Sequence, residues 1–157
     1  MGEPVRPDAN AADAALARSL IQSSPAAVLG VIGADGLPYT ALTAPAAAAD
    51  GAFLILASDL AAHGRALRAN GGASLLFAAS IDPDQPLKTA RLAVSGRATL
   101  SDADRDRVAY LARRPEAALY IDFGDMRLYR LKPSAAHLVA GFGRAVVLDP
   151  AKLAFPL

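Results

Sequence analysis

The chain has 157 residues, no cysteine and a formal net charge of +1, with 16 Lys and Arg against 15 Asp and Glu. The lack of cysteine excludes disulfides, thiolate catalysis and cysteine-ligated metals. The near-neutral charge predicts no nucleic-acid partner. The aliphatic stretches 26–32 and 52–57 are far shorter than the roughly 20 residues that cross a bilayer, so no membrane span is expected. Residues 1–10 lack a basic-then-apolar leader pattern, which predicts a cytoplasmic protein.

The first half of the sequence predicts short strands with two helices among them. Asn10 is a preferred N-cap residue, and Asp13 lies in the first turn of the helix that should follow. Ser58 or Asp59 is the expected cap of the second helix. The expected elements are a helix from Asn10 to about 23–25, strands over 26–32 and 39–47 joined by a turn at 34–36, a strand over 52–57, a helix ending at 70–72 and a strand over 74–78.

The clearest strand pattern of the chain lies at 91–100, where apolar and polar side chains alternate. The two faces are Leu92, Val94, Ala98 and Leu100 on the core side and Arg91, Ser95, Arg97 and Thr99 on the other. Gly96 within this strand indicates a bulge or a bend.

The last third of the sequence predicts a helix and two more strands. Ser101 and Asp104 resemble a capping box for a helix whose apolar side includes Val108. Pro115 predicts a short helix through Ala118. The final strands are expected over 127–132 and 137–140.

Strands in antiparallel succession with helices between them favour an α+β domain centred on a β-barrel rather than βαβ units. We expect one domain over 10–150, with tails at 1–9 and 151–157. The segment Gly141-Phe142-Gly143 lacks the strand-to-helix context of a dinucleotide-binding loop and is expected to form a tight turn.

Several segments resemble pyridoxamine phosphate oxidase. They are Gly36-Leu37-Pro38-Tyr39, then Asp50-Gly51 with the strand to Ser58, then Leu67, Asn70 and Ser74-Leu75-Leu76-Phe77. Later segments are similar to one branch of that family, the haem-utilisation split-barrel proteins. They are Arg91 to Ala98, Arg114-Pro115-Glu116, Gly124-Asp125 with Tyr129-Arg130-Leu131, and the stretch 137–145. The likeness covers about residues 16–148.

This resemblance implies an α+β fold with a six-stranded antiparallel split β-barrel and flanking helices, which dimerises and holds FMN in clefts between the subunits. In the oxidases, a basic pair on the second strand and a Ser-Arg-Lys triplet at the next helix hold the FMN phosphate. The matching positions here are Ala41, Ala46, Ala61, Ala62 and His63. The basic C-terminal segment of the oxidases is also missing, so oxidation of pyridoxamine phosphate is disfavoured.

One group of candidate cofactor-binding residues lies at the second helix. Ser58, His63 and Arg65 lie where the unpaired amides of a helix start and nearby charges favour a phosphate. The alternatives are a solvated surface arginine and a partly buried structural histidine.

The other candidates lie on strands. Arg91 matches the position where the oxidases place a glutamine against the flavin ring, and its guanidinium there would hydrogen-bond the ring carbonyls. Tyr39, Thr40 and Thr43 belong to the strand that the resemblance places along the cleft. A packing role is the alternative for Tyr39, and an exposed strand residue is the alternative for Arg91.

We therefore hypothesise an FMN-binding flavoprotein that acts as a homodimeric, flavin-dependent oxidoreductase. One alternative is a haem-binding protein, in which Arg65, Arg91 or Arg97 would hold the propionates. Another is a non-catalytic dimeric scaffold whose flavin site has decayed. No metal-ligand cluster is evident, and the acidic residues of one helix start, Asp102, Asp104 and Asp106, are expected to cap and to be solvated. The sequence identifies neither catalytic residues nor a substrate, and it leaves the choice among FMN, haem and a deazaflavin open.

Overall fold

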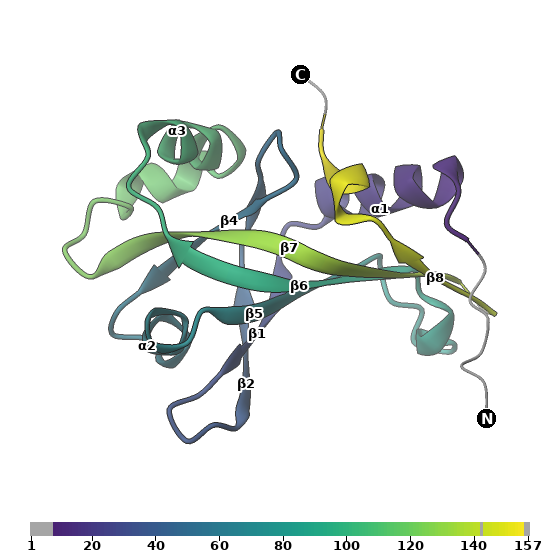
Figure 1. The fold of residues 1–157 in the computed structure, drawn as a ribbon, viewed down its shortest axis with the longest axis horizontal. Helices are drawn as coiled ribbons and strands as arrows, with labels where there is room; N and C mark the ends of the chain where they lie inside the picture. The colour runs from purple at the N-terminus through teal and green to yellow at the C-terminus, as the bar shows by residue number, and fades with distance from the viewer. Residues whose placement is uncertain (1–7, 142, 156–157) are drawn as a thin grey trace.

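The computed structural model describes residues 8–141 and 143–155, and these form one antiparallel sheet of eight strands with surrounding helices (Figure 1). The strand order is β2-β1-β5-β6-β7-β4-β3, and β8 pairs with β7. The strands are β1 (Ala27–Ile32), β2 (Pro38–Thr43), β3 (Ala46–Ala47), β4 (Phe53–Ser58), β5 (Gly72–Ala78), β6 (Arg91–Leu100), β7 (Met126–Gly141) and β8 (Arg144–Leu148). The helices are α1 (Ala11–Ser23), α2 (Ala62–Ala69), α3 (Asp104–Arg113) and the short 3-10 helices η1 (Pro86–Lys88), η2 (Pro115–Leu119) and η3 (Pro150–Leu153).

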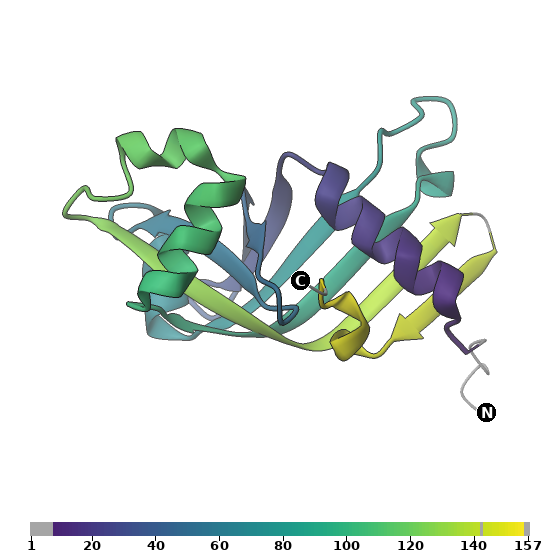
Figure 2. The same cartoon turned by 90° about the horizontal axis from the view of Figure 1, so that it is seen from above.

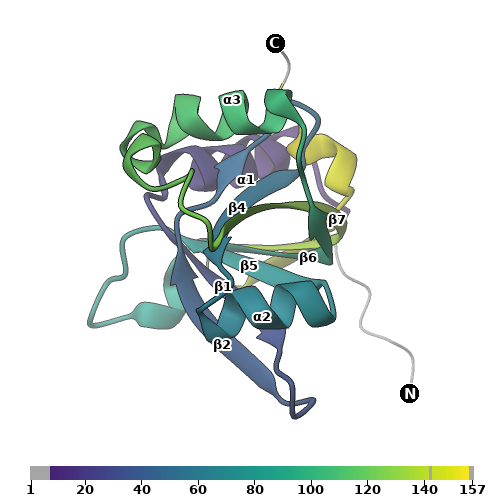
Figure 3. The ribbon, with the colours of Figure 1, turned by 90° about the vertical axis from the view of Figure 1, so that its left-hand side faces the viewer.

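The expected α+β split-barrel fold is confirmed, although the described residues form eight strands instead of six. The sheet curls into a half-barrel, with α1 lying across one of its faces (Figures 2 and 3). The strand expected over 39–47 is divided into β2 and β3, because Pro45 has no N–H for the ladder. The segments 127–132 and 137–140 belong to one long strand, β7, and β8 lies in a segment where no strand was expected.

The first helix begins as expected, but the second does not. The Asp13 N–H donates to Asn10 Oδ1 at 3.0 Å, and the Asn10 N–H donates to Asp13 Oδ2 at 2.9 Å, which completes a capping box for α1. The N-cap of α2 is Ala61, whose side chain carries no hydrogen-bond acceptor. Ser58 lies upstream of that cap and accepts a hydrogen bond from the Leu60 N–H at 3.0 Å instead.

The start of α3 also differs from the capping box expected at Ser101. The Ser101 hydroxyl donates to Asp106 Oδ2 at 2.6 Å, and the Arg130 guanidinium donates to Asp106 Oδ1 at 2.6 Å. Asp106 is only 3% exposed, so the expectation that it is solvated is wrong. Asp106 and Tyr110, four residues apart, share the buried side of α3. Val108 lies two residues from each and is exposed, contrary to the core position expected for it.

The core lies between the inner face of the sheet and the helices α1 and α2. Its largest buried side chains are Leu29, Phe53, Ile55, Leu75, Phe77, Leu92, Tyr129, Leu131, Leu138, Leu148 and Leu153. Leu100, expected on the core side of its strand, is exposed at the end of β6. Within the described residues, no helix combines the length and the apolar character needed to span a bilayer.

The outer face of the sheet carries a row of exposed or half-buried, mostly apolar side chains, one from each of six neighbouring strands. We call these residues the apolar row, and in register order they are Leu42, Val28, Leu76, Ala93, His137 and Val147. Leu42 is the most exposed of them, at 74%.

The turn between β7 and β8 uses glycine at two positions. Gly141 and Gly143 have φ values of 133° and 81°, in the region that side chains with a Cβ avoid, and Gly141 pairs with Arg144. Phe142, which belongs to the expected tight turn, lies outside the described residues, as do 1–7 and 156–157 of the expected tails.

Candidate functional site

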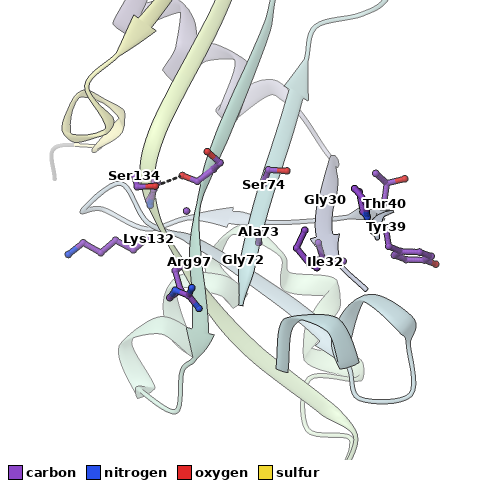
Figure 4. A pocket seen from close by; sticks show the side chains of 15 residues that line it. Gly30, Ile32, Tyr39, Thr40, Gly72, Ala73, Ser74, Arg97, Lys132 and Ser134 are labelled. Carbon is purple, nitrogen blue, oxygen red and sulfur yellow. Dashed lines mark hydrogen bonds between the residues drawn. The ribbon is translucent and has the colours of Figure 1, made fainter. Parts of the chain in front are cut away.

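A groove of about 820 Å³ crosses the outer face of the sheet over β2, β1, β5, β6 and β7 (Figure 4). Thr40, Gly30, Ser74 and Ser95 lie opposite one another on successive strands, and Ser134 of β7 continues the row. Five strands spaced about 4.8 Å apart span about 19 Å. The groove is therefore long enough for a sizeable organic cofactor, with hydroxyl groups along its floor.

Small residues make this floor flat. Gly72, Ala73 and Gly96 line the groove together with Gly30 and Ser74. A Cβ on Gly30 would lie 2.6 Å from Ser74 Oγ, so the glycine leaves space for the serine hydroxyl on the neighbouring strand. A planar ligand can lie close to this part of the floor, and the exposed side chain of Ile32 on β1 borders it.

A bulge places Ser134 in the groove. Ser95 pairs with Ala135 and Gly96 pairs with Pro133, so Ser134 is an extra residue on β7. The Ser134 hydroxyl donates to the Ser95 carbonyl at 3.3 Å. The irregularity expected at Gly96 is confirmed, with the extra residue on the partner strand. A Cβ on Gly96 would lie 2.0 Å from the Lys132 carbonyl oxygen, and glycine is therefore required there.

Two cations lie on neighbouring strands at one end of the groove. Arg97 of β6 and Lys132 of β7 are direct register partners, and both side chains are exposed (Figure 4). Arg97 Nη1 donates to the Asn70 carbonyl at 3.2 Å. Within the part of the chain that the structure describes, neither cation forms an ion pair. Like charges directly opposite each other destabilise a sheet, and an anionic group bound between them would relieve that repulsion.

Of the residues predicted for the cofactor on the second strand, Thr40 lies in the groove and Thr43 does not. Thr43 is buried, and its hydroxyl donates to the Ala27 carbonyl at 3.3 Å. Tyr39 lies at the end of the groove far from Lys132 (Figure 4). It also lines a second cavity of about 570 Å³ between the β1–β2 turn and α2, where Arg65 is another lining residue.

The predicted residues at α2 make mainly internal contacts. The Ser58 hydroxyl donates to Asp125 Oδ2, and an Arg65 guanidinium N–H donates to the Leu60 carbonyl. His63 is half-buried, and burial lowers the pKa of its imidazole, so the neutral form is favoured. None of these three residues lines the groove.

Arg91 lies at the far end of β6, away from Arg97. Its Nη1 donates to the carbonyls of Leu87 and Thr89 at 3.1 and 3.0 Å, which ties the strand to the loop before it. The structure thus brings Tyr39 and Thr40 together at the groove, pairs Tyr39 with Arg65 in the second cavity, and leaves the other predicted residues apart. Their binding roles stay predictions.

The sequence pattern did not point to a site role for Ser74, Ser95, Ser134 or Lys132. Arg97 appeared there only as a possible propionate partner. The alternation along 91–100 places Ser95 and Arg97 on the outer face, and this pattern could have indicated that both belong to a site on that face. The position of Lys132 opposite Arg97 depends on the strand pairing and on the bulge, and a single sequence does not reveal either.

Comparison with known proteins gives one family and several haem-related relatives. The sequence profile described as pyridoxamine 5'-phosphate oxidase matches residues 14–140. The chain is 36% identical over 114 residues to the non-canonical heme oxygenase HOZ, chloroplastic, of Arabidopsis thaliana, a match that covers 71% of this chain and 34% of that protein. The chain therefore spans about a third of the length of this curated relative.

Two solved structures extend the comparison. A heme binding protein from Mycobacterium smegmatis superposes with a TM-score of 0.82 at 28% identity, over 98% of this chain and 63% of that one. The heme storage protein HutZ from Vibrio cholerae superposes with a TM-score of 0.62 at 22% identity, over 74% of this chain and 87% of that one. At this low identity, the second likeness supports the fold alone.

Proposed function

The chain belongs to the pyridoxamine 5'-phosphate oxidase family, and on that premise we propose that it binds haem in the outer groove. The observation that carries this proposal is the combination of a floor of small residues with the cations Arg97 and Lys132, which are register partners on neighbouring strands, at one end. A haem is planar, mostly apolar and carboxylate-bearing at one edge. A groove that is flat over five strands and cationic at one end matches the planar shape and the charged edge.

Several residues of the groove suit particular parts of a haem. Arg97 and Lys132 would hold the propionates by charge-assisted hydrogen bonds. Gly30, Ser74 and Ser95 would face the flat side of the ring. Bound haem would supply an iron centre for redox or oxygen chemistry. The haem-related names of the Arabidopsis and Mycobacterium relatives agree with this proposal.

We also propose that a second copy of the chain covers the groove. The groove is open to solvent on one side, and the apolar row lies beside it on the same face. Exposed apolar rows of this kind are typical of surfaces that another protein covers. A homodimer formed through this face would shield the cofactor from water. The cytoplasmic location and the domain limits of 10–150 stay predictions.

The second candidate function is that of an FMN-dependent oxidoreductase. The same two cations suit a phosphate, and bound FMN would supply electron transfer. Against it, Ala41, Ala46, Ala61 and Ala62 replace the phosphate-holding groups of the oxidases, and Ala46 is buried in a core cluster. For this reason we rank FMN below haem.

Parallel titrations of cofactor-free protein with haem and with FMN test these proposals. We expect a saturable Soret shift with haem. We expect binding to be weaker by at least about tenfold when Arg97→Gln and Lys132→Gln are combined, since the loss of even one charge-assisted hydrogen bond costs that much. Lys152→Gln is the matched control, since Lys152 is an exposed cation outside the groove.

Three results would change the assignment. Quenching of FMN fluorescence without a Soret shift would favour the oxidoreductase. The absence of both signals would favour a scaffold with a decayed site. A Soret shift that the double variant and the control weaken equally would place the haem outside this groove.

A further inference from the structure

We propose that the outer groove recognises a porphyrin by its ring and its carboxylates and not by its metal, so that metal-free protoporphyrin binds as well as haem does. This selectivity rests on the proposed haem function and adds a ligand class to it. The side chains that line the floor and the grouping of cations at one end carry the inference.

The floor of the groove lacks the side chains that bind haem iron. Protein ligands of that iron are histidine, cysteine, methionine and tyrosine. The sequence contains no cysteine. Among the described residues, no histidine or methionine lines the groove, and Tyr39 is the one lining residue with a group of this kind.

Tyr39 is not directed toward the iron of a ring that lies on the floor. It pairs with Val31, whose side chain is in the core, so the strand directs Tyr39 to the side of α2. This agrees with its place in the cavity between the β1–β2 turn and α2, and with its position at the end of the groove far from Lys132 (Figure 4). The sheet side of the ring would therefore have no protein ligand for a metal.

Hydroxyl groups and glycine occupy the middle of the floor instead. Ser74 of β5 and Ser95 of β6 are direct register partners, and Gly30 of β1 is the partner of Ser74. A serine hydroxyl is not among the usual ligands of haem iron. The gain from covering an apolar ring face depends on the area removed from water, which the metal hardly changes. This floor should therefore hold a ring with iron and a ring without it about equally well.

The charged groups of the groove lie at one end, where they suit the carboxylates of the ring. Arg97 and Lys132 are register partners, both side chains are exposed, and they are the two cations among the described residues that line the groove. Hydrogen bonds between ionised partners are roughly twice as strong as neutral ones. The strongest contacts of the ligand would thus involve its carboxylates, which haem and metal-free protoporphyrin share.

A neighbouring cavity adds another cation at the same end. It has a volume of about 550 Å³ and shares Lys132 with the groove. Arg105 of α3 lines it, with its nearest carboxylate partner as far as 3.9 Å away. The two carboxylates of this cavity are engaged, since Asp50 pairs with Arg130 and Asp149 accepts a hydrogen bond at the start of η3. Two carboxylates on one edge of a ring could therefore each meet a cation.

The test compares three ligands with the full chain: haem, metal-free protoporphyrin and protoporphyrin dimethyl ester. Haem is followed by its Soret band, and the two metal-free rings are followed by their fluorescence. We expect the dissociation constants of haem and metal-free protoporphyrin to agree within about threefold, since no bond from the groove to the metal is lost. The ester keeps the ring but has no carboxylate charge, and it should bind at least about tenfold more weakly.

Substitutions of the cations separate the ring from its carboxylates. Arg97→Gln combined with Lys132→Gln should weaken haem and metal-free protoporphyrin by the same factor and leave the affinity for the ester unchanged. Lys152→Gln is the control and should change none of the three, since Lys152 lies outside the groove. Bound ferrous haem should show no iron–histidine stretch in resonance Raman spectra, and added imidazole should bind to its iron.

The outcomes distinguish this inference from the haem proposal itself. Haem that binds at least about tenfold more tightly than the metal-free ring, or an iron–histidine stretch, would overturn the inference and leave haem binding standing. Equal binding of the ester and the free acid would overturn the role of the carboxylates. If neither haem nor metal-free protoporphyrin binds, the proposed function fails and this inference fails with it.

Discussion

Arg144 holds Asp13 through two parallel hydrogen bonds, from Nε to Oδ1 at 3.0 Å and from Nη2 to Oδ2 at 2.6 Å. The pair joins β8 to the first turn of α1, two elements that are far apart in the sequence. Asp13 is 4% exposed and also completes the capping box with Asn10. A buried carboxylate is thus paired with a cation and bonded to a backbone N–H, which is how proteins tolerate such a group.

This pair predicts a particular dependence of stability on pH. The hydrogen bond from Arg144, and then the bond from the Asn10 backbone, lower the pKa of Asp13. The contribution to the free energy of unfolding is therefore complete above the ordinary carboxyl pKa of about 4, and it is lost as the pH falls through the lowered value. We expect Arg144→Gln to be less stable than the native protein at pH 7, with the gap closing below about pH 4. Urea unfolding at several pH values measures this, and a gap that is equally large at acidic pH would contradict it.

A single methyl group added at Gly96 should strongly lower the free energy of unfolding. In Gly96→Ala, the new Cβ would lie 2.0 Å from the Lys132 carbonyl oxygen, and backbone on both strands would have to move. We expect a loss of about 1–3 kcal/mol in the free energy of unfolding, the usual cost of overpacking. Gly124→Ala is the control, because a Cβ there meets no atom within 4 Å. Equal stability of the two variants in urea unfolding would contradict this prediction. It would show that the backbones of β6 and β7 move apart at the bulge with little cost in free energy.

Much of the fold could be predicted because its signals are local. The capping side chain of Asn10 and the alternation over 91–100 act on neighbouring residues only, and both led to elements that the structure contains. The sequence shows a proline at position 45, a residue type that can interrupt a strand. Whether it does so depends on which strand lies alongside. The pairing of β8 with β7 was not foreseen, although Ala145 to Leu148 form a continuous apolar run.

The candidate site was harder to predict than the fold. Thr40 was expected in it, whereas the Arg97–Lys132 pair depends on the register of β6 and β7. A slip of one residue reverses which face a side chain occupies, and the bulge at Ser134 introduces such a slip. Buried positions on β7 accordingly change from Ala136 and Leu138 on one side of the bulge to Leu131 and Tyr129 on the other. This change of phase is present in the sequence, but it becomes meaningful only once the partner strand is known.

Gly30 offers a way to obstruct the groove without disturbing the core. In Gly30→Ala, the Cβ would meet Ser74 Oγ at 2.6 Å, and that hydroxyl can rotate away. We expect stability to stay within about 0.5 kcal/mol of the native value, as for other surface changes. Gly30→Val with Ser74→Ala should keep the fold but raise the floor of the groove, and haem affinity should then drop about tenfold or more. Unchanged haem affinity in this double variant would place the ligand elsewhere.

Substitutions at Leu42 and Leu76 test whether the chain self-associates through the apolar row. Both side chains belong to the apolar row, and a charge there would have to be buried if a second copy covers this face. We expect Leu42→Glu and Leu76→Glu each to shift the protein from dimer to monomer in analytical ultracentrifugation. Leu119→Glu serves as control, because Leu119 is 81% exposed on η2 and lies outside the row. A dimer that survives both substitutions in the row but dissociates with Leu119→Glu would move the interface to the side of α3 and η2. A native protein that sediments as a monomer would contradict the proposed dimer and leave the groove open to solvent.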